Sequence, residues 1–115
     1  GYKSCYKFAN GEWQQFTLMG ENRQSAAGVM YKNKFHVFGG RGTGYMQDQT
    51  TIQTSEIISM VFSGPVNDDL VDYGPKLPEA VKNHAITAIN ATVSILSGGH
   101  TSSTSASAQT WYFKH

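Results

Sequence analysis

The chain has 115 residues, enough for one domain, and its nine Lys and Arg residues nearly balance its eight Asp and Glu residues. A formal net charge of +1 offers no electrostatic basis for binding nucleic acid or an anionic membrane, and no apolar run reaches the roughly 20 residues that a membrane span needs. The low charge content, twelve glycines and 12% aromatic residues indicate an all-β fold rather than a helical one.

Nine short β-strands are expected, separated by turns with clear local signals. Asn10-Gly11 is the strongest hairpin signal in the chain, and Lys32-Asn33 is a second two-residue turn between β-prone runs. Apolar residues do not recur at helical spacing, so at most one helical turn is expected, near residues 79–81. The expected strands are residues 4–8, 13–18, 25–31, 34–38, 55–62, 70–73, 84–91, 92–97 and 109–113.

A strand that ends in two glycines occurs twice. Gly39-Gly40 and Gly98-Gly99 are 59 residues apart, and each pair follows a run of β-branched or aromatic residues. Two further aromatic residues, Trp13 and Tyr73, are separated by a similar interval of 60 residues. The same unit recurring at a fixed spacing predicts a repeat architecture.

These units resemble the kelch repeat. The matching features are a small-residue strand, a hairpin, an apolar strand ending in Gly-Gly, a variable loop, and a strand with a tyrosine followed by an aromatic residue. Tyr112 matches the family's third-strand tyrosine, Trp13 matches its fourth-strand tryptophan, and Tyr73 replaces a second tryptophan. The resemblance implies a β-propeller built of four-stranded antiparallel blades, in which these aromatic residues and the double glycines have structural roles.

The resemblance also implies how the chain divides into blades. Residues 1–22 would form the outer strands of a preceding blade, residues 23–75 one complete kelch blade, and residues 76–115 the inner strands of a following blade. A closed ring typically has 4–8 blades. We therefore expect that the rest of a longer propeller, or other chains, completes the ring.

Strands alternate in direction within a blade, so four loops are expected on one face of the ring: residues 41–54, 100–106, 19–23 and 76–84. Exposed Tyr, Arg and Met side chains on loops held by a rigid scaffold are typical of protein-binding surfaces, although a tolerated insertion would also explain the longest loop. We expect a non-catalytic scaffold module that binds a protein partner through this face. The expected contact residues are Arg23, Arg41, Thr43, Tyr45, Met46, Gln47, His84, His100 and Thr101.

Two other functions remain open: a structural or matrix component of an assembly, and part of a propeller oxidase or carbohydrate-active enzyme. No catalytic constellation, metal site or cofactor is expected. The glycines at 39–44 do not have the spacing of a phosphate-binding loop, and the four histidines do not have the spacing of metal ligands.

The compartment is indicated by two residues. Cys5 is the only cysteine, so it is either a free thiol or half of a disulfide to a partner outside these residues. Asn90-Ala91-Thr92 is an acceptor sequence for N-glycosylation. Together they favour an extracellular, secreted protein over a cytoplasmic one.

Overall fold

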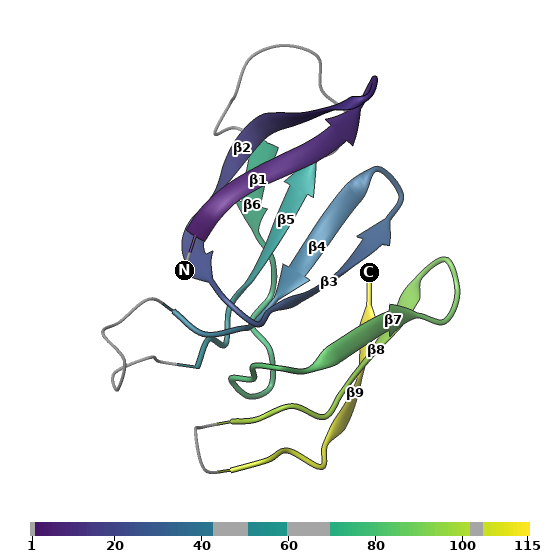
Figure 1. The fold of residues 1–115 in the computed structure, drawn as a ribbon. Helices are drawn as coiled ribbons and strands as arrows, with labels where there is room; N and C mark the ends of the chain where they lie inside the picture. The colour runs from purple at the N-terminus through teal and green to yellow at the C-terminus, as the bar shows by residue number, and fades with distance from the viewer. Residues whose placement is uncertain (1, 43–50, 60–69, 102–104) are drawn as a thin grey trace.

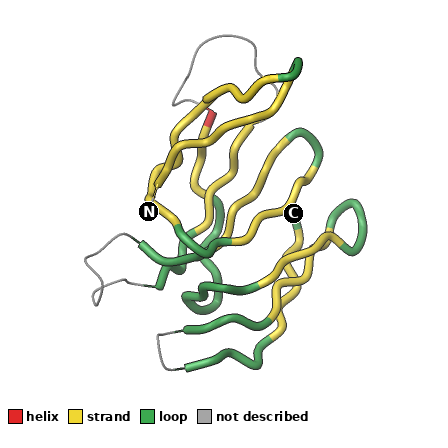
Figure 2. Tube along the Cα trace, in the orientation of Figure 1, coloured by secondary structure: helices red, strands yellow, loops and turns green. Residues whose placement is uncertain are grey.

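The computed structural model describes residues 2–42, 51–59, 70–101 and 105–115, and these form an all-β structure of antiparallel sheets, as the sequence predicts. Nine strands form sheets of two, four and three strands, which lie next to one another (Figure 1). Figure 2 shows strands joined by loops, with one residue of 3₁₀ geometry, Leu70, just before β6. The strands are β1 (Tyr2–Ala9), β2 (Glu12–Arg23), β3 (Ala27–Tyr31), β4 (Lys34–Phe38), β5 (Ser55–Ser59), β6 (Val71–Tyr73), β7 (Ala85–Ala88), β8 (Val93–Ser97) and β9 (Thr110–Lys114).

The first sheet is the hairpin of β1 and β2. Its turn residues Asn10 and Gly11 have φ angles of 55° and 78°, which is the backbone that an Asn-Gly hairpin turn adopts. β2 continues to Arg23, well past the expected end at residue 18. The long strand therefore carries the chain from the hairpin turn to the end of the sheets where the double glycines lie.

The central sheet has the order β3-β4-β5-β6, and its two faces follow from the strand register. Val29, His36 and Ile57 are direct neighbours across three strands, so their side chains share one face. Met30 and Phe35 are opposite each other, and Phe35 is opposite Ile58, which places these three on the other face. Both faces of this sheet carry apolar residues and require cover.

Each face of the central sheet packs against a different neighbouring sheet. On one face, Phe38 belongs to an apolar core with Leu77, Val81 and Leu96, and β3 lies against β7 of the third sheet. On the other face, Val37 and Ile58 form a second core, against which Cys5 and Met19 of the hairpin pack. There, β2 lies against β5 and β6. The chain is therefore a stack of three sheets with the four-stranded sheet in the middle.

The backbone repeats its geometry at the glycine ends of the sheets. Ser25 and Asn83 are both non-glycine residues with positive φ, 56° and 55°, and they lie 58 residues apart. Gln24 forms an isolated antiparallel bridge with Arg41, and Lys82 forms the same bridge with His100. The internal repeat inferred from the double glycines thus extends to the connecting segments.

The structure corrects the alignment of the two repeats. The turn between β7 and β8 is one residue longer than that between β3 and β4, so the spacing is 58 residues before the turn and 59 after it. β9 begins at Thr110 rather than at residue 109, and the second loop after a double glycine runs from residue 100 to 109 instead of ending at 106. The expected strand at 84–91 is shorter, as β7, because its last residues form the turn. Residues 60–62 of another expected strand lie outside the described residues.

Candidate functional site: the loop face

The ends of the sheets at the double glycines form one surface, which we call the loop face and define by residues 19–24, 39–42, 51–54, 81–84 and 98–101. Backbone hydrogen bonds join its segments across sheets. The Gly40 N–H donates to the Val81 carbonyl at 2.8 Å, and the Asn83 N–H donates to the Ser25 carbonyl at 2.9 Å. An added Cβ at Gly39 would lie 2.4 Å from the Val81 carbonyl oxygen, so a side chain does not fit there. The loop face is therefore a rigid frame.

Arg23 lies beneath this face rather than on it. Its Nε donates to Glu56 at 2.7 Å, and Nη1 donates to the carbonyls of Gly39 and Thr54 at 2.8 and 2.9 Å. Nη2 donates to Glu21 at 3.1 Å and to Thr54 Oγ1 at 2.9 Å, so all five guanidinium N–H groups have acceptors. Arg23 is 6% exposed. The expectation that it is a surface contact residue is wrong, because it joins β2 to β5 instead.

Arg41 is half-buried and fixed at the rim of the loop face. Its backbone forms bridges with Gln24 on one side and Thr51 on the other, and its Nε donates to Gln24 Oε1 at 3.0 Å. The remaining guanidinium N–H groups form no ion pair with any residue that the structure describes. Arg41 therefore keeps donors available for a ligand.

A polar pocket of about 450 Å³ opens on the loop face beside these residues. It is formed by the end of β2 and the two described ends of the 41–54 loop, so it brings together two of the loops singled out in the sequence. Glu21 accepts hydrogen bonds from Arg23 and from Thr54 Oγ1, which fixes its carboxylate at the pocket. The lining residues are Gly20, Glu21, Asn22, Gly42, Thr51, Ile52, Gln53 and Thr54.

Sequence reasoning gave the general place of this pocket but not its residues. The carboxamide of Gln53 is one of the fixed groups at its wall, since Nε2 donates to the Leu77 carbonyl at 2.8 Å. The signal available in the sequence was the loop length alone, and that does not say which amide or hydroxyl faces the pocket. The pocket offers carboxylate, hydroxyl and amide groups, which suit hydrogen bonds to a polar ligand.

His84 is buried under the double glycines, which corrects its expected role as an exposed contact. Neither of its ring nitrogens makes a hydrogen bond of normal geometry with a described atom. Burial lowers the pKa of His84, and the Phe38 carbonyl opposes this shift only in part, so the ring is neutral near pH 7. The ring lies close to Gly39, where it fills the junction between the central and third sheets.

The other expected contact residues are divided between exposed positions and undescribed ones. His100 is exposed and Thr101 is half-buried; the Thr101 hydroxyl donates to the Ser105 carbonyl at 3.4 Å. The His100 backbone forms bridges with Lys82 and Ala106, as Arg41 does in the first repeat. Thr43, Tyr45, Met46 and Gln47 lie outside the described residues.

The aromatic residues expected in structural roles lie on outer strands. Tyr73 covers Gly20 of β2, since a Cβ added at Gly20 would be 2.6 Å from the Tyr73 hydroxyl. Trp13 is 71% exposed and makes an edge-on contact with Phe8, with ring centroids 5.3 Å apart. Tyr112 is also largely exposed, on the side of the third sheet that faces away from the central sheet. Trp13 and Tyr112 are therefore not core residues within the described structure.

A histidine cluster lies between the central and third sheets. His36 Nε2 is 3.0 Å from Ser55 Oγ, and that hydroxyl donates to the Pro75 carbonyl, so Nε2 carries the proton. Burial, with a further contribution from His115, lowers the pKa of His36 to about 4. His36 stacks on Phe38 at 4.0 Å between ring centroids. Among the described residues, no three His, Cys, Asp or Glu side chains are placed to hold a metal ion.

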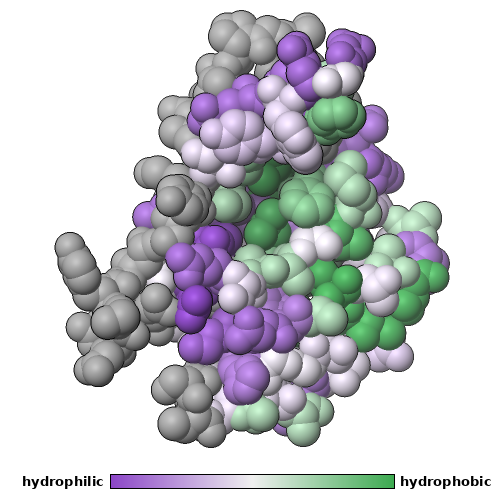
Figure 3. All heavy atoms as spheres, viewed as in Figure 1, coloured by the Kyte–Doolittle hydropathy of each residue, from purple (hydrophilic) through white to green (hydrophobic). Residues whose placement is uncertain are grey.

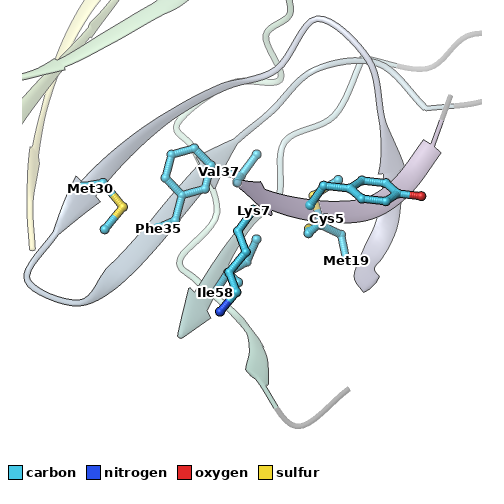
Figure 4. Close-up of a pocket in the computed structure, with 8 residues that line it drawn as sticks. Cys5, Lys7, Met19, Met30, Phe35, Val37 and Ile58 are labelled. Atoms are coloured by element: carbon cyan, nitrogen blue, oxygen red, sulfur yellow. The ribbon is translucent and has the colours of Figure 1, made fainter. Parts of the chain in front are cut away.

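An apolar groove of about 460 Å³ separates the hairpin from the inner strands of the central sheet. Figure 3 shows apolar residues gathered in the middle of this side of the molecule, below the hairpin. Figure 4 shows Met30, Phe35 and Val37 on one wall, Cys5 and Met19 on the other, and Lys7 and Ile58 between them. Cys5 is a half-buried free cysteine, and burial followed by the nearby Glu56 carboxylate raises the pKa of its thiol.

No protein-family model and no curated protein matches this chain in sequence. No helix in the described residues has the length and apolar character to cross a membrane. The functional assignment therefore depends on the fold and on the two cavities.

Proposed function

We propose that this chain is a segment of a kelch-type β-propeller and that it serves as a non-catalytic scaffold, binding a protein partner through the loop face. Residues 23–75 form a complete blade in this proposal, with outer strands of a preceding blade in residues 1–22 and inner strands of a following blade in residues 76–115. The remaining blades come from further sequence or from other chains.

The observation that carries the proposal is the pair of contacts made by the central sheet. On one face, the contact uses β3 and β7, the first strands of their sheets. On the other face, the contact uses β2 with β5 and β6, which are the last strands of theirs. The two contacts are complementary halves of one kind of junction between neighbouring four-stranded sheets. A radial array of such sheets is the arrangement of propeller blades.

The repeated connectors also support this proposal. Gly39 N–H donates to the Thr54 carbonyl, and Gly98 N–H donates in the same way to the Gln109 carbonyl. Both double glycines have positive φ at each residue. A structural unit that recurs with its backbone hydrogen bonds intact is expected of a repeat protein, in which each unit contacts its neighbours.

Nuclear Overhauser contacts test the stack of sheets. The rings of Phe38 and Phe113 have centroids 5.0 Å apart and Ile58 packs near Met19, so cross-peaks are expected on both faces of the central sheet. Loss of either set, with the β3–β4 and β4–β5 ladders intact, would refute the propeller arrangement.

The binding role is supported by the character of the loop face. Arg41 and His100 occupy equivalent bridging positions, and the polar pocket lies beside Arg41 on a frame held by backbone hydrogen bonds. Loops on a rigid scaffold are the usual place for recognition. Arg is also enriched in protein interfaces.

A peptide library displayed on phage tests this role with the intact chain as bait. Selected peptides are expected to lose at least about tenfold in affinity when Arg41→Glu or Gln53→Ala is introduced, equivalent to about 1.4 kcal/mol. Asn33→Ala, at the opposite end of the central sheet, is the matched control and should leave binding unchanged. Peptides that respond only to Asn33→Ala would place recognition elsewhere and overturn the proposal.

A structural role in an assembly is the second candidate, and the exposed aromatic residues favour it. Tyr6, Phe8 and Trp13 are each more than half exposed on the hairpin. Contiguous exposed apolar surface marks contact sites. Analytical ultracentrifugation separates the two candidates. A monomer that binds loop-face peptides supports the scaffold, and assembly abolished by Trp13→Ser supports the structural role.

A further inference from the structure

The apolar groove beside the hairpin has the shape of a site for two strands. We propose that it receives an antiparallel β-hairpin that pairs with β1 and lies over Met30 and Phe35, and that this hairpin is chemically like β3–β4 of this chain. The inference rests on the proposed function, and it defines the partner that the first sheet requires.

The exposure of Met30 is the first observation. Met30 is 49% exposed although it sits on the apolar face of the central sheet next to Phe35. On the opposite face, Val29 at the neighbouring position of the same strand is packed against the core that includes the third sheet. The inner strands of the central sheet are thus covered on one face and open on the other.

The equivalence of strands identifies what would cover the open face. β1 and β2 make the contacts of third and fourth strands, because β2 lies against β5 and β6 while β3 and β4 face the groove. Among the described strands, β1 pairs with β2 alone. A hairpin added on the other edge of β1 would complete the order seen in β3-β4-β5-β6.

The side chains of the occupant follow from the covered face. There the central sheet presents Val29 and Phe38 from its two inner strands to the third sheet. The groove walls are apolar apart from Lys7 and the Tyr6 hydroxyl, so a hairpin with that pattern would bury apolar surface against Met30, Phe35 and Val37. Burial of this kind is non-directional, and pairing with β1 sets the register.

A second copy of this chain fits the groove less well. Its exposed sheet contains three strands, β7, β8 and β9, and the third would occupy the place that β1 already holds. The occupant has two strands, so we assign it to a hairpin supplied by further sequence or by another chain.

A fusion tests the assignment. A second copy of residues 24–42, which contains no cysteine, is placed before Gly1 through a Gly/Ser linker of about ten residues. Cys5 lines the groove, so its alkylation by iodoacetamide is expected to slow at least about tenfold, and the β1 amides should gain hydrogen-exchange protection. The control carries Val29→Asp and Phe38→Asp in the added copy only, and its Cys5 should react as in the unfused chain.

The outcomes separate the two proposals. Equal Cys5 alkylation in fusion and control, with β3–β9 protected in both, overturns the hairpin site and leaves the stack of sheets standing. Absent contacts between the Phe38 and Phe113 rings in the unfused chain overturn the proposed function itself. A synthetic peptide of residues 24–42 added in excess to the unfused chain repeats the test without a fusion. Slower Cys5 alkylation at higher concentration of the unfused chain alone would assign the groove to a second copy.

Discussion

The buried ion pair between Arg23 and Glu56 gives the sharpest test of how the hairpin is held on the central sheet. The side chains are 1% and 0% exposed, with Nε 2.7 Å from the carboxylate. Glu56 also accepts a hydrogen bond from the Gly20 N–H. Replacing Glu56 by Leu therefore leaves a buried guanidinium with Glu21 as its remaining carboxylate, and that side chain is 39% exposed.

The expected cost follows from this geometry. Removing one member of a buried ion pair costs about 3–5 kcal/mol, because the other charge stays buried without compensation. Glu21 offsets part of this, so we expect Glu56→Leu to lower the free energy of unfolding by about 3 kcal/mol. Arg23→Met should cost about 4 kcal/mol, since it also leaves the Gly39 and Thr54 carbonyls without their donor.

A double-mutant cycle separates the pair from its surroundings. The double variant Arg23→Met with Glu56→Leu is expected to cost about 2–3 kcal/mol less than the sum of the two single costs. Urea unfolding followed by the fluorescence of Trp111, which packs against the core, measures all four proteins. Glu21→Gln is the control and should cost less than about 1 kcal/mol. Single costs below about 1 kcal/mol that simply add would refute the view that this pair fixes the hairpin.

Three further predictions concern pH, the glycines and the glycan. Burial lowers the pKa of His36 from 6.5 to about 4, so the unfolded chain binds a proton that the folded chain does not. The full shift is worth about 3 kcal/mol, and solvent in the bordering pocket screens part of it. The free energy of unfolding should thus fall by about 2 kcal/mol as pH drops from 6.5 toward 4, and urea titrations of His36→Phe should show a smaller fall. Gly39→Ala should cost about 3 kcal/mol because its Cβ would meet the Val81 carbonyl, whereas Gly98→Ala, with the same sign of φ and open space, should cost about 1 kcal/mol; equal melting temperatures would contradict this. Asn90 is exposed in a turn, so in a secretory host we expect a glycan mass that Asn90→Gln abolishes, and an unmodified mass would remove this support for an extracellular setting.

The sequence predicted those features of the fold that local chemistry specifies. The turn at Asn10-Gly11 and the positive φ angles at Gly39-Gly40 follow from residue type, and they appear in the structure as expected. The all-β class followed from composition. These predictions succeed because each depends on a few adjacent residues.

The candidate site was predicted less well because burial depends on residues far apart in the chain. Arg23 is 33 residues from Glu56, and no local pattern shows that the two meet. His84 was expected at the surface because it lies beside a loop, but the glycines next to it leave room for its ring inside the junction. A charged or titratable side chain next to a loop is a weak indicator of exposure when small residues let neighbouring segments approach.

The two junctions of the central sheet use different chemistry in equivalent positions. Arg23 precedes Gln24, the partner of Arg41, and Val81 precedes Lys82, the partner of His100, so Arg23 and Val81 occupy the same place in their repeats. Arg23 is in an ion-pair network, whereas Val81 is in an apolar core. The backbone bridges are the same in both, as are the positive φ angles of the glycines. The junction geometry is therefore set by the main chain, and either chemistry can fill it. This explains why the repeat could be recognised from its glycines but not from the residues that it buries.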